Sequence, residues 1–353
     1  MAHLQRSYTP ALIVLVGCLI GLVTFGPRSS IGLFQIPITQ DHGWNREVFS
    51  FAVAIQNLLW GVGQPFAGAM ADRFGTVRVL CVGAILYGLG QTFMAFAETP
   101  NELMMGAGVL IGFGLSGCSF NVVLAAFGKL LPENMRPLAF GAGTAAGSFG
   151  QFLFPPIANQ LIGSIGWMDT TVIFGFTLLL VLPLSIPLAT RSLGQAQAGS
   201  TPQQSITQAL AEAFRHPSYL MLVIGFFTCG FQLAFITAHM PAYLRDLGLP
   251  ASVGGWTLAL IGLANAVGSL MSGYWSARLP KRYLLAGIYF GRSLTVLMFL
   301  MLPASPENSY LFGVLIGLLW LSTVPPTSAL VMLMFGTRYM AMLYGFAFFS
   351  HQL

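Results

Sequence analysis

Long apolar runs, each about the length of a membrane-spanning helix, follow one another along almost the whole chain. A helix that crosses the hydrocarbon core needs about 20 mostly apolar residues, and runs of this length recur here with mostly short polar connections between them. Only 7% of the residues are charged, whereas a soluble domain carries about 25%. No soluble fold of this size can hide so much apolar surface, so the sequence predicts a polytopic membrane protein.

We predict that every span is an α-helix, because open strands and loops cannot satisfy their backbone polar groups in lipid. The first run is too long for a signal peptide and lacks a small-residue cleavage site, so we expect it to remain as a span. The predicted spans are 11–38, 47–71, 78–97, 103–128, 138–162, 170–190, 218–243, 252–277, 283–303, 310–335, and an eleventh that begins near Met340 and continues to Leu353.

The short connections show a strong asymmetry of lysine and arginine, which sets the orientation of a membrane protein. With the N-terminus in the cytoplasm, only Arg46 and Arg245 fall outside. The other loop cations fall inside: Arg6, Arg73, Arg78, Lys129, Arg136, Arg191, Arg215, Arg278, Lys281, Arg282 and Arg338. We therefore predict a multi-pass protein of the cell inner (plasma) membrane with a cytoplasmic N-terminus. The net charge of +5 follows this topology, and no nucleic-acid partner is expected.

The longest polar connection, residues 191–217, divides the chain into halves that resemble each other. The segment "LLWGVGQPFAG" (58–68) aligns without gaps with "LANAVGSLMSG" (263–273). Parallel repeats of this kind occur in transporters that bind substrate between two bundles. We predict an N-terminal six-helix bundle over 1–190, a cytoplasmic loop over 191–217 whose second half forms a short surface helix, and a C-terminal bundle over 218–353.

The connection between the second and third spans reads "GAMADRFGTVRVL". Gly68 lets helices approach closely and Gly75 permits a tight turn. Asp72 is suited to face the N-terminal end of a helix dipole or an arginine of the other bundle. Gly68, Asp72, Arg73, Gly75 and Arg78 match the G-x-x-x-D-R-x-G-x-x-R signature, and on this motif the chain resembles the major facilitator superfamily. We predict that these five residues form a conformational latch.

The resemblance covers essentially the whole chain. Within the superfamily, "FGPRSSIGLF…GWNREVFSFA" and "FQLAFITAHMPAYLRDLGL" look like the bacterial branch related to monocarboxylate and oxalate/formate transporters. The resemblance implies two six-helix bundles, alternating access, and a central cavity lined by the first, fourth, seventh and tenth spans. Because the family normally has twelve spans, the second bundle is expected to lack its last span and a half, as in a fragment.

Arg28 lies deep in the first span, directly after Pro27. Placing arginine at mid-membrane costs about 2.5–3.5 kcal/mol on insertion scales, and such residues usually face a pathway. Its planar guanidinium suits a carboxylate, and no acid lies deep within any span. We infer that the substrate supplies the missing negative charge. The alternative is that Arg28 snorkels outward or caps carbonyls freed by Pro27.

Further polar residues recur at matching positions of the two halves. Gln35 lies seven residues after Arg28 and His239 lies seven residues after Gln232, so each pair is predicted to share a helical face. Gln232 and His239 lie 204 positions after Arg28 and Gln35, so the two pairs occupy matching positions of the two halves. His239 titrates in the range that proton symport needs; a purely hydrogen-bonding histidine is the alternative, and anion exchange needs no titrating group.

Other spans supply weaker candidates for substrate contact: Asn121, Asn265, Trp320 and Tyr344. Asn265 is the most polar deep residue of the eighth span, where members of the resembled branch often carry an arginine. For Asn121 an interhelical hydrogen bond is the alternative. Arg292 belongs to the ninth span, which is peripheral in this fold, so a packing or helix-bonding role is at least as plausible there.

The leading hypothesis is a secondary active transporter that moves a small organic anion, such as a monocarboxylate, by alternating access, as proton symport or anion exchange. The alternatives are efflux of neutral or amphipathic compounds and, more remotely, a non-transporting membrane sensor. The sequence contains no HExxH, no nucleophile–histidine spacing, no metal-ligand cluster and no P-loop, so no enzyme, metal or cofactor is predicted. We expect a monomer whose partners are the lipid bilayer, the anion, and protons or a counter-anion.

Overall fold

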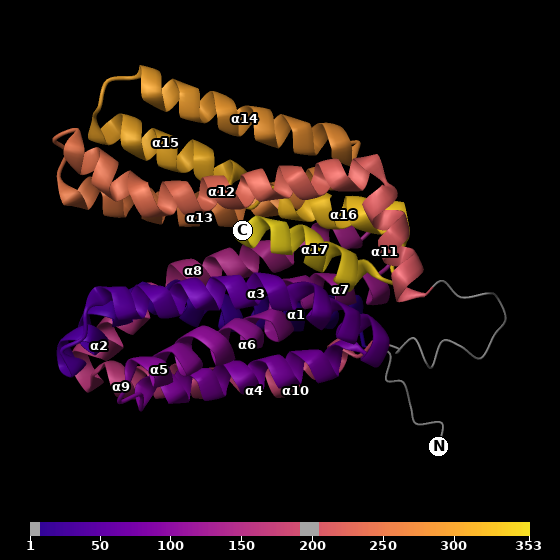
Figure 1. Ribbon diagram of the computed structural model, residues 1–353. Coiled ribbons are helices and arrows are strands. Elements are labelled where there is room, and N and C mark those ends of the chain that lie inside the picture. The colour runs from indigo at the N-terminus through magenta and orange to yellow at the C-terminus, as the bar shows by residue number, and fades with distance from the viewer. Residues whose placement is uncertain (1–7, 191–204) are drawn as a thin grey trace.

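Two stacks of roughly parallel helices lie one above the other in the protein (Figure 1). The structure is a computed structural model that describes residues 8–190 and 205–353, and within those ranges no strand occurs. The first half of the chain forms the indigo-to-magenta bundle and the second half forms the salmon-to-yellow bundle. The all-helical fold with two repeated bundles is therefore confirmed.

The first bundle contains six spans, several of which are interrupted. The first span consists of α1 (Pro10–Ser29), a 3-10 turn (Ile31–Phe34) and α2 (Gln35–His42), and the second and third are α3 (Arg46–Phe74) and α4 (Thr76–Ala95). The fourth consists of α5 (Pro100–Leu103), a π-helical segment (Met104–Leu110), α6 (Ile111–Cys118) and α7 (Phe120–Leu130). The fifth is α8 (Arg136–Ile165), and the sixth consists of α9 (Trp167–Leu178), α10 (Val181–Ser185) and a 3-10 turn (Ile186–Leu188).

The second bundle follows α11 (Ile206–Arg215), the surface helix predicted within the central loop. Ser205 and Gln208 start α11 with a capping box. The spans of this bundle are α12 (Pro217–Asp246), α13 (Ala251–Ser276), α14 (Lys281–Met301), α15 (Pro306–Leu319) with α16 (Val324–Phe335), and α17 (Met340–Gln352). Each predicted span coincides with helix. Arg6, Arg191 and the loop segment 191–204 lie outside the described residues.

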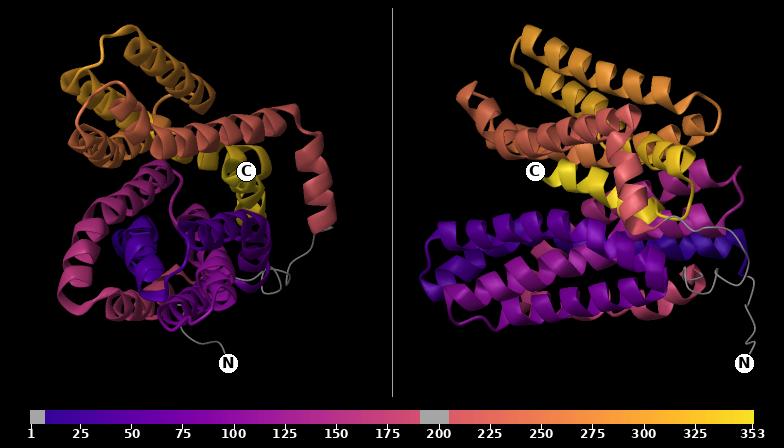
Figure 2. Two further views of the ribbon diagram at one scale, coloured as in Figure 1. Left: turned by 60° about the vertical axis from the view of Figure 1, so that its left-hand side comes forward. Right: turned by 45° about the vertical axis from the view of Figure 1, so that its right-hand side comes forward.

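Length and hydropathy single out eight stretches of the described chain as able to cross a membrane, and α3, α8 and α17 are not among them. These three helices build the contact between the bundles, because α3 packs along α17 and α8 packs along α13. Figure 2 shows α17 between the two stacks. The helix α17 has only 13 residues and is too short to count, whereas α3 and α8 are long enough but less apolar. A helix that faces protein on several sides does not need a lipid-like surface, which accounts for the composition of α3 and α8.

The bundles meet at two seams, one between α3 and α17 and one between α8 and α13. Glycines bring the backbones into contact at both. A Cβ on Gly141 of α8 would lie 2.8 Å from the Ser269 carbonyl oxygen and 2.9 Å from the Gly273 Cα of α13. A Cβ on Gly68 of α3 would come within 2.7 Å of the Met342 amide nitrogen of α17. Small residues at membrane helix interfaces allow such close approach, so both seams depend on the absence of a side chain.

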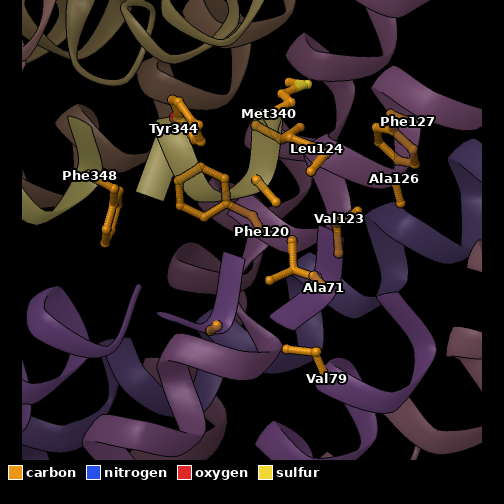
Figure 3. Close-up of a cluster of buried hydrophobic side chains, with 14 of the residues drawn as sticks. Ala71, Val79, Phe120, Val123, Leu124, Ala126, Phe127, Met340, Tyr344 and Phe348 are labelled. Carbon is orange, nitrogen blue, oxygen red and sulfur yellow. The ribbon is translucent and has the colours of Figure 1, made fainter. Parts of the chain in front are cut away.

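The largest buried core joins the two halves rather than lying within one of them. Figure 3 shows Phe120 of α7 beside Tyr344 and Phe348 of α17, with Met340 and Leu124 packed close by. Because α7 belongs to the first bundle and α17 to the second, apolar packing continues across the bundle boundary. The candidate site lies in this region.

A candidate substrate site between the bundles

The fourth and tenth spans are each broken at equivalent positions of the repeat. Ser119, with φ −70° and ψ 160°, separates α6 from α7. Residues 320–323 separate α15 from α16, and Thr323 lies 204 positions after Ser119. Each break leaves helix ends inside the membrane region, where backbone groups need partners from side chains or ligands. Discontinuous helices of this kind build substrate sites in transporters.

Aromatic rings from five helices surround the first break and form a central aromatic cluster. The Phe25 ring lies 5.8 Å from Trp60 and 5.1 Å from Phe120, and the Trp60 ring lies 5.1 Å from Phe348. On the side of the second bundle, the His351 ring stacks on Phe348 at 5.5 Å and lies 4.9 Å from Phe226. The members of the cluster are Phe25, Trp60, Phe120, Phe226, Tyr344, Phe348 and His351.

Several polar atoms in and beside this cluster are buried without a hydrogen-bond partner. The side chain of Asn121 is 1% exposed, and neither its amide nitrogen nor its amide oxygen has a partner. The Trp60 Nε1 and both ring nitrogens of His351 are also buried and unpaired. Buried polar groups are nearly always paired with protein or water. These atoms therefore mark a place where a polar ligand or water completes the structure.

Arg28 and Gln35 both lie against α3 of their own bundle. The Arg28 Nη2 donates a hydrogen bond of 2.5 Å to Asn57 Oδ1, and the Gln35 Nε2 donates one of 3.0 Å to Ser50 Oγ. Arg28 and Gln35 are seven residues apart in the first span. Their partners Asn57 and Ser50 are seven residues apart on α3 in the reverse order, as antiparallel neighbours require. A second guanidinium nitrogen, Arg28 Nε, is buried and unpaired. Among the described residues no carboxylate forms an ion pair with Arg28.

Gln232 and His239 do not act as a similar pair. The Gln232 Oε1 accepts a hydrogen bond of 3.3 Å from Arg292 Nη1 of α14, whereas the exposed His239 ring packs 4.9 Å from Phe235 near the end of α12. Their spacing predicted a shared helical face. Both residues lie on α12, but Gln232 is half-buried against Arg292 whereas His239 is exposed.

Arg292 binds the end of a broken helix. Its side chain is 1% exposed, and its Nη2 donates to the Leu319 carbonyl oxygen at 2.8 Å and also to the Trp320 carbonyl oxygen. These are the last carbonyls of α15, where the helix dipole is negative. The helix-bonding alternative raised for Arg292 thus matches its contacts. The buried Trp320 contributes a backbone carbonyl here and packs in a separate apolar cluster of the second bundle.

Asn265 lies at the seam between α8 and α13 with its amide fully engaged. Its Nδ2 donates to Ser148 Oγ at 2.8 Å, and its Oδ1 accepts from the Leu321 amide at 2.9 Å and from Ser269 Oγ at 3.3 Å. The side chain therefore joins the first bundle to the break between α15 and α16. Its polar atoms are occupied by protein partners, which differs from the cavity-lining position expected for it.

Gly68 and Asp72 of the predicted latch lie where α3 meets α17, whereas Arg73, Gly75 and Arg78 lie at the turn between α3 and α4. The Asp72 Oδ1 pairs with Lys129 Nζ at 2.5 Å, and its Oδ2 accepts from the Met342 amide at 3.0 Å. Gly68 supplies the close approach described above, and Gly75 adopts a φ of +90° at the turn that follows α3. Arg73 and Arg78 are exposed beside this turn. Whether the contact latches one conformation remains a prediction.

Asn121 and Tyr344, two of the predicted candidates for substrate contact, are both buried. Sequence reasoning missed Trp60, Phe120 and Phe348. Aromatic residues in spans are usually packing residues, so nothing in their type distinguishes them. A usable signal is the set of amides that flank Trp60 on α3. Gln56 and Gln64 reach the Ala107 carbonyl oxygen and Ser119 Oγ of the fourth span, at 2.7 Å and 2.8 Å. Such amides indicate that this face of α3 contacts protein.

Among the described residues, no three His, Cys, Asp or Glu side chains gather in a way that could hold a metal ion. All four cysteines are free thiols: Cys18, Cys81, Cys118 and Cys229.

Two repeated helical bundles that enclose broken helices and unpaired polar groups define a membrane transport protein. The sequence matches the Major Facilitator Superfamily over residues 16–353, and the chain belongs to that family. It is 28% identical over 341 residues to the MFS-type transporter YcxA of Bacillus subtilis (strain 168), covering 94% of this chain and 82% of the relative.

Other similar proteins agree with this assignment. The chain is 23% identical over 326 residues to monocarboxylate transporter 11 of Homo sapiens, covering 84% of this chain and 66% of that protein. The fold is similar to that of the Escherichia coli fucose:proton symporter FucP, with a TM-score of 0.75 and 16% identity, covering 98% of this chain and 89% of that one. The protein is therefore a transporter and not an enzyme.

Proposed function

We propose that the protein is a secondary transporter for a small organic anion, most simply a monocarboxylate. The observation that carries this proposal is Arg28, whose guanidinium has an amide oxygen as its hydrogen-bond partner and has no ion-paired carboxylate among the described residues. A cation held within the membrane region needs a counter-charge. A substrate carboxylate provides that charge in the geometry that guanidinium prefers.

The break at Ser119 supports the same class of substrate. The helix α7 begins there, so the positive end of its dipole and its free N–H groups lie inside the bundle. Asn121, in the first turn of α7, adds an amide with no protein partner. An anion beside Asn121 would meet N–H donors without a competing acid. The monocarboxylate transporters among the relatives add a further argument, although it rests on similarity alone.

The aromatic cluster favours a second candidate, the export of neutral or amphipathic compounds. Rings such as Trp60, Phe120 and Phe348 offer apolar contact area with a few polar edges, which is typical of sites for small organic molecules. A transporter of this kind would not need the charge of Arg28. The two candidates therefore differ in their response to loss of that charge.

The test is uptake of radiolabelled pyruvate by the full chain reconstituted in proteoliposomes, with Arg28→Ala beside the wild type. We expect uptake to be abolished while the variant keeps its gel-filtration profile. Arg46→Ala, an exposed arginine at the start of α3, is the matched control and should transport normally. Normal pyruvate uptake by Arg28→Ala would contradict the anion proposal. Retained efflux of an amphipathic dye by the same variant would favour the second candidate.

The coupling mode follows from a second measurement on the same vesicles. Proton symport predicts that an inward pH gradient drives accumulation, whereas anion exchange predicts that internal anion accelerates uptake without a gradient. We propose His239 as the residue that carries the proton in the first case, because an imidazole can both accept and donate a proton and this one lies exposed on α12.

A further inference from the structure

A groove on the outer surface of the first bundle runs between α3, α4 and α6 and ends at Arg78. It holds about 460 Å³. Its walls are large apolar side chains that are not covered by protein: Phe66 is 68% exposed, Val82 55% and Met70 46%. This surface faces away from the other bundle, which contacts α3 through α17 on its opposite seam.

Small residues create the floor of this groove. A Cβ on Gly83 of α4 would lie 2.6 Å from the backbone of Gly117 in α6, and a Cβ on Gly63 of α3 would lie 2.3 Å from Ser116 Oγ. The helices therefore meet without side chains between them, and the side chains of Phe66 and Phe113 line the groove. The result is a narrow apolar channel open to the membrane.

A second hollow of about 360 Å³ adjoins the groove at its Arg78 end. Phe74 and Arg78 line both spaces, so the two are continuous. The second hollow is lined in addition by the turn residue Gly75 and by Thr190 after the sixth span. It is the more polar of the two, as expected at the end of a span where the membrane interface begins.

Arg78 lines both hollows, Arg73 directly precedes the lining residue Phe74, and neither arginine has an ion-paired carboxylate among the described residues. Arg73 lies 5.2 Å over the Phe74 ring, and both Arg73 and Arg78 are exposed. Within the described ranges no carboxylate forms an ion pair with either, since Asp72 is paired with Lys129 and Glu133 with Arg136. The segments 1–7 and 191–204 contain no Asp or Glu. Both guanidinium groups are therefore open to an anion from outside the protein.

We propose that this composite site binds one anionic phospholipid, with its phosphate at Arg78 and Arg73 and one acyl chain along the groove. From Gly63 to Phe74 the helix α3 rises about 16 Å, which matches one leaflet of a hydrocarbon core about 30 Å thick. A free phosphate would use the arginines but leave the groove empty. A zwitterionic lipid carries its own cation and gains less from the two unpaired arginines.

The experiment is native mass spectrometry of the purified full chain titrated with dioleoyl phosphatidylglycerol or dioleoyl phosphatidylcholine. We expect one phosphatidylglycerol to bind in preference to phosphatidylcholine. Arg78→Gln should weaken that binding about fivefold, the effect of one arginine at an anionic surface. Val82→Trp should weaken it by filling the groove while the arginines remain. Arg282→Gln, an exposed arginine in the second half, should bind phosphatidylglycerol as the wild type does.

Equal retention of the two lipids by the wild type would overturn the proposal. So would unchanged phosphatidylglycerol binding in Arg78→Gln, or in a Val82→Trp protein with a wild-type gel-filtration profile. Competition by glycerol phosphate would show that a headgroup alone suffices, and this too would overturn the acyl-chain site. Lack of competition by glycerol phosphate is the expected result.

Discussion

The carboxylate of Asp72 in α3 accepts a hydrogen bond of 3.0 Å from the Met342 amide in the first turn of α17, so the two bundles share a helix cap. The first N–H groups of a helix have no partner within the helix, and the dipole favours a negative charge there. The same carboxylate pairs with Lys129. We predict that the bundles rock in alternating access and that this contact breaks when they part at this end.

Replacement of Asp72 by Asn should weaken this junction. The amide oxygen can still accept from Met342, but it cannot neutralise Lys129, which is only 14% exposed. We expect a loss between the roughly 1 kcal/mol of an exposed pair and the roughly 3 kcal/mol of a buried one. Thermal unfolding in detergent measures the loss, with Glu98→Gln, an exposed acid, as control. A midpoint equal to that of the control would contradict the prediction.

Gly141→Ala should destabilise the seam between α8 and α13. The added methyl would lie 2.8–2.9 Å from the backbone of α13, and overpacking of this kind costs about 1–3 kcal/mol. Gly163→Ala in the same helix is the matched control, because a Cβ there meets no atom within 4 Å. The control gains helix propensity without a clash and should be neutral or stabilising. Equal stability of the two variants would show that the seam is looser than described.

Arg292→Lys tests whether this arginine supports the helix break. Lysine keeps the charge but loses the fork that serves Gln232 and the carbonyls of Leu319 and Trp320 together. We expect a lower thermal midpoint and an unchanged KM for transport in the protein that remains folded. Arg282→Lys, which is exposed, controls for the substitution itself. A raised KM at unchanged stability would instead indicate substrate contact.

His239→Gln tests the proposed proton coupling. Glutamine preserves a hydrogen-bonding side chain on the exposed end of α12 but cannot carry a proton. Accumulation driven by a pH gradient should be lost, whereas exchange of internal for external anion should continue at the wild-type rate. His42→Gln, which alters a half-buried histidine stacked on Trp44, is the control. If the His239 variant accumulates anion normally, another group carries the proton or exchange is the mechanism.

Most of the helical architecture could be predicted from the sequence, since the length and polarity of a segment decide whether it can cross lipid. For α4, α12 and α14, the length of the apolar run was enough to predict a membrane span. The motif residues Gly68 and Asp72 were also predictable in position, because their spacing is local. Ser205 and Gln208 also indicate the start of the surface helix α11, because their spacing is that of a capping box.

Only the tertiary structure decided which polar side chains are free to meet a ligand. Arg28, Asn121 and Asn265 look alike in sequence, as single polar residues within apolar runs. In the fold Asn265 finds three partners, Arg28 finds one, and Asn121 finds none. The physical reason is that a hydrogen bond across helices depends on packing between segments that are 29, 56 and 117 residues apart in these cases. Local periodicity selects a helical face but does not reveal what lies opposite.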